Sequence, residues 1–247
     1  MTTKKIALFG MFRSGTNYTR TVLEWNYNCE LVTNVHEWKH GFFPIITERS
    51  QKKYEHMDII YVTKDPFASI SSLYKYYMTN GRNIHAAKDW KSFLRNRFII
   101  YDFFQENSPQ YRFANVVDFW NSMNWNLSSI AKSNFQTVHV QYNSLLDSPL
   151  QHTQEIASTL GLTPKYKSAS EFKRPSKITK NMGDRERHSD QDYMTPRMFD
   201  RKNYTKRRYY DLFEAEDKNF VLENIDIELA KKLGYLDELI LVKKKLS

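Results

Sequence analysis

Short apolar runs alternate along the chain with stretches that carry apolar residues at helical spacing, and this order predicts strands followed by helices. A buried strand is expected in "KIALFG" (5–10) and a helix in "SGTNYTRTVLEWN" (14–26). The same order recurs where "MDIIYVTKDP" (57–66), a buried strand ending at Lys64, precedes the helix "FASISSLYKYYM" (67–78). The pattern therefore predicts repeated strand–loop–helix connections.

Other segments extend this alternation. "ELVTNV" (30–35) and "FQTVHVQY" (135–142) are expected strands, and "SPLQHTQEIASTLGL" (148–162) is an expected helix that Gly161 ends. Helical spacing of apolar and aromatic residues also predicts helices within 89–104, 116–132 and 214–235. The order predicts an α/β fold of P-loop type, a single domain over 1–247 whose central parallel sheet is flanked by helices. Ligands are then expected at the carboxyl ends of the strands.

Residues 163–203 interrupt the pattern. This segment is long, strongly charged and without hydrophobic periodicity. A stretch of that length with no element of its own is typical of a lid or a disordered segment. We expect a mobile basic lid here.

Composition narrows the setting. The 247 residues are 40% hydrophobic and 15% aromatic, which suits a globular chain with a full core. A single cysteine, Cys29, excludes an internal disulfide framework and favours a reducing compartment. The apolar run near the N-terminus is too short for a signal peptide or a membrane anchor. We therefore expect a cytoplasmic protein with no membrane span.

The formal net charge of +9 suits a partner that carries phosphates or sulfates, and on composition alone it suits nucleic acid equally well. The basic residues show no zinc-finger spacing, recognition-helix signature or RNA-binding strand motif. A nucleic-acid partner is accordingly the less favoured interpretation.

The segment between the first strand and the first helix has the glycine spacing of a phosphate-binding loop. Gly10 and Gly15 are separated as in a nucleotide-hydrolysing P-loop, but Thr16 and Asn17 stand where that motif has Lys and Ser or Thr. Arg13 lies inside the loop instead. Backbone N–H groups at a helix start favour anions, and a guanidinium adds to them. The alternative is that both glycines only permit a tight turn and that Arg13 is a surface charge.

With these residues in view, "FRSGTNYTRTVLE" (12–24) resembles the 5′-phosphosulfate loop of sulfotransferases that use 3′-phosphoadenosine 5′-phosphosulfate (PAPS), and it is most similar to the tyrosylprotein type. The resemblance implies that PAPS is the co-substrate and that no metal is needed. It assigns PAPS binding to the loop residues Arg13, Ser14, Gly15, Thr16, Asn17 and Tyr18.

Three further segments carry the resemblance. "VTKDPFASISSLYKYY" (62–77) is similar to the family's 3′-phosphate motif, with Lys64 as the basic residue and Ser72 as the serine eight positions on. "HVQYNSLLDSPLQHTQEIASTLGL" (139–162) is similar to a later strand, turn and helix of the family, which implies that Tyr142 approaches the adenine ring. By the same resemblance, Arg201 and Lys202 form a clamp on the nucleotide.

The acceptor must lose a proton as it attacks, so a base is expected near the sulfuryl group. "TNVHEWKHGFFP" (33–44) supplies His36, Glu37 and His40 as candidates beside Lys39. The tyrosylprotein branch favours Glu37, whereas other sulfotransferases, whose base is a histidine beside a lysine, favour His40. We rank both ahead of His36.

The resulting hypothesis is in-line transfer of a sulfuryl group from PAPS to a hydroxyl or amine. Arg13 would stabilise the leaving phosphate, and the acceptor could be a carbohydrate, a tyrosine or a small alcohol. A P-loop nucleotide kinase is a rival, but the sequence has neither the loop Lys nor a convincing Mg²⁺-holding Asp at a strand end. A non-enzymatic nucleic-acid-binding protein is a second rival, which explains the charge but not the loop.

Overall fold

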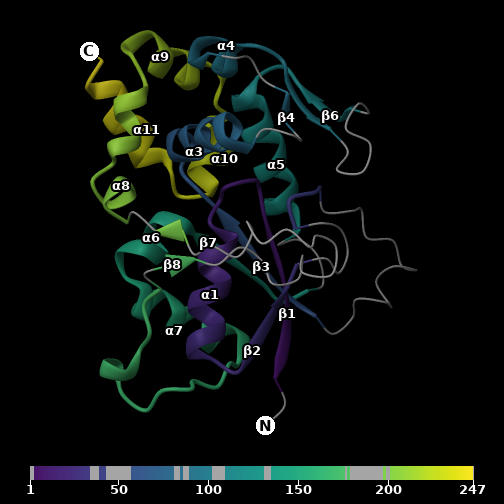
Figure 1. Cartoon of the computed structure of the whole chain (residues 1–247), viewed down its shortest axis with the longest axis vertical. Helices are drawn as coiled ribbons and strands as arrows, with labels where there is room; N and C mark the ends of the chain where they lie inside the picture. The colour runs from purple at the N-terminus through teal and green to yellow at the C-terminus, as the bar shows by residue number, and fades with distance from the viewer. Residues whose placement is uncertain are drawn as a thin grey trace. The chain divides into compact units, whose positions relative to one another are not determined.

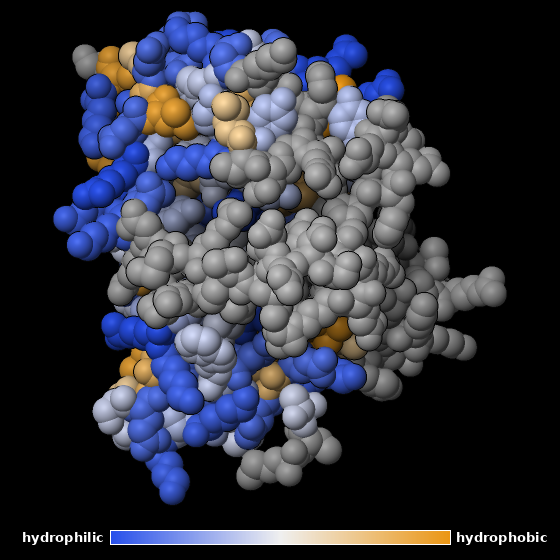
Figure 2. Space-filling view, viewed as in Figure 1, coloured by the Kyte–Doolittle hydropathy of each residue, from blue (hydrophilic) through white to orange (hydrophobic). Residues whose placement is uncertain are grey.

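The structure is a computed structural model. It describes residues 3–33, 39–42, 57–80, 84–85, 89–101, 109–130, 135–175, 177–178, 197–198 and 201–246. The chain forms two compact units, one made of residues 1–63 and 126–205 and the other of residues 64–125 and 206–247. On the face shown in Figure 2, hydrophilic side chains predominate among the described residues and apolar ones form only small groups.

The first unit is built on a parallel sheet. Its four strands lie in the order β2-β1-β3-β7 (Figure 1). Their bounds are β1 Lys4–Gly10, β2 Cys29–Val32, β3 Asp58–Thr63 and β7 Thr137–Gln141. Gly10 pairs with Val62, and Thr63 pairs with Gln141. The carboxyl ends of these central strands therefore meet at one edge of the sheet, where a parallel α/β fold places its ligands.

Helices cover this sheet because its strands are apolar on both faces. Ile6, Leu8 and Ile60 are at most 1% exposed, as expected for strands buried on both sides. Against the sheet and one another pack α1 (Thr16–Asn26), α6 (Tyr142–Asp147) and α7 (Pro149–Leu160), with α8 (Arg201–Thr205) on α6 (Figure 1). The predicted α/β fold with a central parallel sheet flanked by helices is confirmed. The prediction of one domain over 1–247 stays a prediction.

The second unit has an aromatic core. Its helical elements are α3 (Pro66–Asn80), α4 (Trp90–Arg95), η4 (Arg208–Leu212), α9 (Ala215–Asn224), α10 (Ile227–Lys232), α11 (Leu236–Lys244) and the part of α5 (Val116–Ile130) that ends at Trp125. A small antiparallel sheet joins β4 (Ile84–His85), β5 (Phe98–Tyr101) and β6 (Pro109–Phe113). Phe67, Phe93, Phe98, Phe119 and Trp120 are fully buried, and Phe98 stacks on Phe119 with ring centroids 4.9 Å apart.

The helix expected within 89–104 is confirmed for residues 90–95 and wrong for residues 98–101. Helix α4 ends at Arg95, and β5 then pairs antiparallel with β6. Phe98 and Ile100 are buried while Ile99 and Tyr101 are half-buried, so the segment has strand periodicity. Aromatic and β-branched residues favour this pleated, half-buried surface over a helix. The prediction took the segment's aromatic residues as a helix face.

Other elements follow the predicted order. Gly161 ends α7 in the left-handed conformation (φ 63°), as the sequence predicts. The expected helical end over 214–235 is divided into α9 and α10, because Asp226 accepts a hydrogen bond from the Leu229 N–H and starts a new helix. Helix α11 follows these two.

The start of the predicted lid is anchored. The Asn26 side chain, at the end of α1, hydrogen-bonds the backbone N–H and carbonyl of Lys173 at 2.8 and 2.9 Å. A short 3-10 turn, η1 (Ala169–Glu171), and the paired strands β8 (Lys177–Ile178) and β9 (Arg197–Met198) also fall in this region. Residues 179–196, the central part of the predicted lid, lie outside the described residues.

Candidate functional site

The loop between β1 and α1 is tightly folded over the strand end. Arg13 has a positive φ of 64°, unusual for a residue with a side chain, and Gly15 has a φ of 103°. A Cβ at Gly10 would lie 2.4 Å from the Ser14 hydroxyl and 2.8 Å from the Val62 carbonyl oxygen. Gly10 is therefore required because the loop and β3 approach its backbone closely.

The second loop glycine is covered by Tyr142. A Cβ at Gly15 would lie 2.1 Å from the Tyr142 ring, which is only 3% exposed. The ring also makes edge contacts with Tyr18 and Tyr204. Burial raises the pKa of Tyr142 well above its ordinary value, although the Arg13 charge acts in the opposite direction. Tyr142 is thus a neutral phenol that packs against the loop, and its approach to an adenine ring stays a prediction.

Helix α1 begins without a side-chain cap. Gly15 occupies the N-cap position, and the first turn has no acidic residue. The first N–H groups of a helix have no partner within it, and they carry the positive end of the helix dipole. The Ser14 hydroxyl beside them is fully buried and has no hydrogen-bond partner among the described residues. This helix start can hold an anion.

A lysine from another part of the chain reaches the same helix start. The ammonium of Lys39 donates to the Asn17 side-chain oxygen at 3.0 Å, and Lys39 is only 6% exposed. Its backbone is fixed as well, because its N–H donates to Thr33 and its carbonyl accepts from the Gly10 N–H. A buried cation thus lies beside a loop whose own sequence lacks the P-loop lysine.

His40 lies against the other side of the loop. Its Nδ1 is 2.6 Å from the Gly10 carbonyl oxygen, and its ring stacks on Phe12 with centroids 4.9 Å apart. Burial, assisted by the charges of Lys39 and Arg13, lowers the pKa of His40 to about 3. The other base candidates, His36 and Glu37, lie outside the described residues.

Lys64 and Ser72 belong to the second unit. Lys64 follows the last residue of β3 and is 1% exposed, and its carbonyl accepts from the Trp120 indole at 3.0 Å. The Ser69 hydroxyl donates to the same carbonyl at 3.3 Å, so Ser69 has a backbone role. Ser72 is 8% exposed on α3. A lysine buried to this degree is rare in proteins unless it is paired.

Asp65 starts α3. Its Oδ1 accepts from the Ala68 N–H at 2.8 Å, while its buried Oδ2 has no hydrogen-bond partner among the residues that the structure describes. Burial, with a further contribution from Glu238, raises the pKa of Asp65 from 3.8 to about 7. An aspartate follows β3, and the structure gives it the role of a helix cap.

We expect Asp65→Asn to stabilise the protein, and to do so more at pH 8 than at pH 5. The folded pKa of Asp65 lies above its unfolded value, so its contribution to stability is complete below pH 4 and is lost as the pH rises through 7. Asparagine keeps the acceptor for Ala68 and never ionises. The gain at pH 8 is on the order of 2–4 kcal/mol, measurable by urea unfolding at both pH values. Equal changes at both would contradict the prediction.

Comparison with solved structures identifies the fold. The chain resembles the crystal structure of mouse sulfotransferase SULT7A1 complexed with PAP, with a TM-score of 0.54 and 13% sequence identity over 100% of this chain and 91% of that chain. The chain has the sulfotransferase fold. No family model and no curated protein matches the sequence.

In this sulfotransferase fold, the loop residues predicted from the sequence and the residues that approach the loop belong to one unit. Residues 13–18, Lys39, His40 and Tyr142 all lie in the first unit. Lys202 is exposed on α8, and Arg201 begins that helix. The described residues form no helix with both the length and the apolar character to cross a bilayer.

The ammonium of Lys39 at Asn17 was not predicted. Lys39 lies in the segment predicted to supply the base, but nothing in its spacing links it to Asn17, 22 positions earlier. The feature that could have indicated Lys39 was the histidine next to it, because other sulfotransferases have a lysine beside the histidine that is their base.

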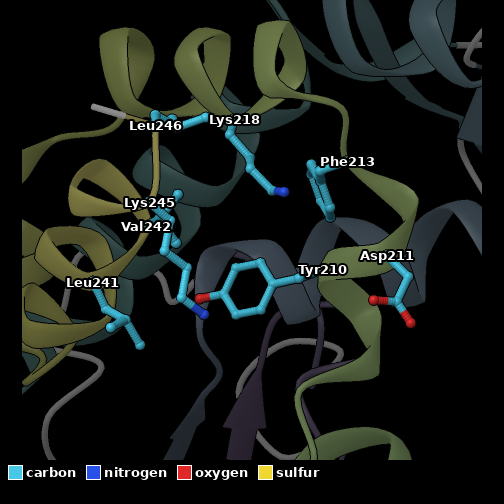
Figure 3. A pocket seen from close by; sticks show the side chains of 8 residues that line it. All are labelled: Tyr210, Asp211, Phe213, Lys218, Leu241, Val242, Lys245 and Leu246. Atoms are coloured by element: carbon cyan, nitrogen blue, oxygen red, sulfur yellow. The ribbon is translucent and has the colours of Figure 1, made fainter.

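The second unit contains a separate pocket of about 410 Å³. Figure 3 shows Lys218 reaching from α9 toward the rings of Tyr210 and Phe213, with the C-terminal residues opposite. Its lining residues are Tyr210, Asp211, Phe213, Lys218, Leu241, Val242, Lys245 and Leu246. None of the predicted site residues lines this pocket.

Proposed function

We propose that this protein transfers a sulfuryl group from PAPS to a hydroxyl or amine acceptor and releases adenosine 3′,5′-bisphosphate (PAP). One observation supports the proposal most directly. In a chain with the sulfotransferase fold, the start of α1 has no side-chain cap and lies beside the buried Lys39 and beside Arg13, whose backbone is in the left-handed conformation. These groups are donors and positive charges, which suit a phosphosulfate.

In the proposed reaction, the N–H groups of Thr16, Asn17 and Tyr18 hold the 5′-phosphosulfate, as helix starts hold phosphates. The Ser14 hydroxyl supplies a further hydrogen-bond donor to the same group. Arg13 stabilises the charge that develops on the bridging oxygen as the bond to sulfur breaks. The acceptor oxygen or nitrogen attacks sulfur in line, and its proton goes to a base.

We assign the remaining roles as follows. Lys64 and Ser72 bind the 3′-phosphate, while Tyr142, Arg201 and Lys202 complete the nucleotide site. The base comes from the segment that contains His36, Glu37 and His40. We place the reaction in the cytoplasm, because the one cysteine of the chain, Cys29, is a buried free thiol. Burial raises the pKa of Cys29 to about 12, which keeps it in the unreactive thiol form.

We expect PAP to bind without metal and to raise the melting temperature, because a ligand that binds only the folded state stabilises it. Calorimetry in excess chelator measures this. Failure of PAP to bind, with ATP binding restored by Mg²⁺, would favour a kinase. Salt-sensitive RNA binding without affinity for PAP would favour a nucleic-acid-binding protein.

Lys64→Met and Ser72→Ala test the 3′-phosphate assignment. Each removes a partner of a charged group, so each should reduce the preference for PAP over its 3′-hydroxyl analogue by about 10- to 100-fold. Methionine retains the buried stem of Lys64, which limits the loss of packing. Lys75→Ala, an exposed lysine on α3, is the control. Parental discrimination in both variants would show that the 3′-phosphate binds elsewhere.

A sulfate-transfer assay can identify the acceptor. Labelled sulfate from PAPS should enter a carbohydrate, a tyrosine-containing peptide or a small alcohol when a panel of these is supplied. Acceptor pockets are built from variable loops, so the phosphate site does not choose among them.

A further inference from the structure

The dipeptide Lys39–His40 holds both polar groups of one loop residue. The Gly10 N–H donates to the Lys39 carbonyl at 3.0 Å, and the Gly10 carbonyl lies 2.6 Å from Nδ1 of His40. Gly10 is the last residue of β1 and the first glycine of the phosphate loop. The dipeptide is therefore bonded to the point where the chain leaves the sheet and enters the loop.

The hydrogen bond to Gly10 fixes the state of the imidazole. A carbonyl oxygen only accepts, so Nδ1 must carry a proton and donate it. The ring is also held flat against Phe12, with an interplanar angle of 19°. Gly10 and Phe12 both precede Arg13, so His40 contacts the loop directly before its left-handed residue.

The surroundings of His40 oppose a second proton. Among the described residues, the charged groups acting on it are Lys39 and Arg13, both cations, and the side chain is half-buried against the loop. These effects outweigh the hydrogen bonding to the carbonyls of Gly10 and Met11, and the pKa falls to about 3. A base of that strength has little driving force to take a proton from a hydroxyl near neutral pH.

We propose that His40 is a positioning residue, which with the Lys39 carbonyl clasps Gly10 and keeps the phosphate loop in its anion-binding shape, and that the proton acceptor is another group. This inference rests on the proposed function. It leaves Glu37, His36 or the acceptor itself to receive the proton.

Two substitutions separate the clasp from a base. His40→Asn places an amide N–H where Nδ1–H stands and removes Nε2, whereas His40→Ala removes both. The Ala variant should bind PAP at least 10-fold more weakly and exchange the amides of residues 10–19 faster. The Asn variant should recover both properties and keep kcat within about fivefold of the parent, with its pH–rate profile unshifted.

The opposite result is equally specific. A His40→Asn protein that binds PAP and protects its loop as the parent does, yet loses kcat by about 100-fold or more together with the acidic limb of its pH profile, would identify Nε2 of His40 as the base. His152→Ala is the matched control, because His152 is a partly exposed histidine on α7 that pairs with Glu155.

A ligand-free measurement keeps the clasp separate from the proposed function. Nitrogen-15 shifts of the His40 ring should report the Nδ1–H tautomer from pH 5 to 8, with and without PAP. Titration near pH 6.5 in either state, or loop exchange unaffected by His40→Ala, would overturn the clasp. If the parent shows the tautomer and the loop protection but neither binds PAP nor transfers sulfate, the clasp stands and the sulfotransferase proposal fails.

Discussion

Arg13→Ala is expected to lower kcat by about 10²-fold or more while nucleotide affinity falls much less. The guanidinium is proposed to act where charge gathers on the leaving phosphate, so its loss raises the barrier more than it weakens binding. The positive φ at this position costs alanine and arginine nearly the same conformational free energy, so the substitution tests the guanidinium alone. Fixed-time assays with labelled PAPS measure kcat, and calorimetry measures PAP affinity.

Two further substitutions sharpen the Arg13 result. Arg13→Lys should recover part of kcat, because the cation remains but the planar donor pair is lost. Arg20→Ala removes an arginine of α1 that pairs with Glu24, and it should leave kcat near the parental value. If Arg13→Ala and Arg20→Ala behaved alike, Arg13 would be a surface charge and the loop would act through its backbone alone.

Gly15→Ala is expected to be the most damaging single-atom addition in the first unit. The new methyl would lie 2.1 Å from the buried Tyr142 ring at a backbone φ of 103°. Neither the ring nor the helix start can move without disturbing the core. We expect a loss on the order of 3 kcal/mol or more in the free energy of unfolding, together with loss of PAP binding. Chemical denaturation measures the first and calorimetry the second.

Gly161→Ala is the matched control for Gly15→Ala. Gly161 also has a positive φ, 63°, but a Cβ there meets nothing within 4 Å. It should cost only about 1 kcal/mol, the backbone penalty alone, and leave PAP affinity unchanged. Equal costs at the two positions would mean that Tyr142 does not constrain the loop.

The local parts of the fold could be predicted from the sequence. Adjacent residues determine the strand that ends at Gly10, the turn at Arg13 and the helix that begins at Thr16, because glycine spacing and apolar periodicity act over a few positions. The end of α7 at Gly161 was predictable for the same reason. By contrast, the strand Phe98–Tyr101 depends on pairing with β6, and its own pattern is too short to decide between helix and strand.

Long-range contacts could not be predicted. The position of the Lys39 ammonium at Asn17 depends on how the chain returns after β2, and the packing of Tyr142 on Gly15 joins segments more than a hundred residues apart. The resemblance indicates Tyr142 as a nucleotide contact, which stays a prediction, whereas the structure shows that its ring packs on the loop. Two of the charges that act on Asp65, those of Glu238 and Arg207, likewise lie far from it in the sequence.

The Lys39 N–H donates to the Thr33 carbonyl, directly after β2, at 2.9 Å, and the Lys39 carbonyl accepts from the Gly10 N–H at 3.0 Å. The backbone of this one residue therefore links the segment that follows β2 to the point where β1 enters the phosphate loop. A substitution that displaces the Lys39 backbone is expected to disturb both strand ends together, even where its side chain keeps the charge.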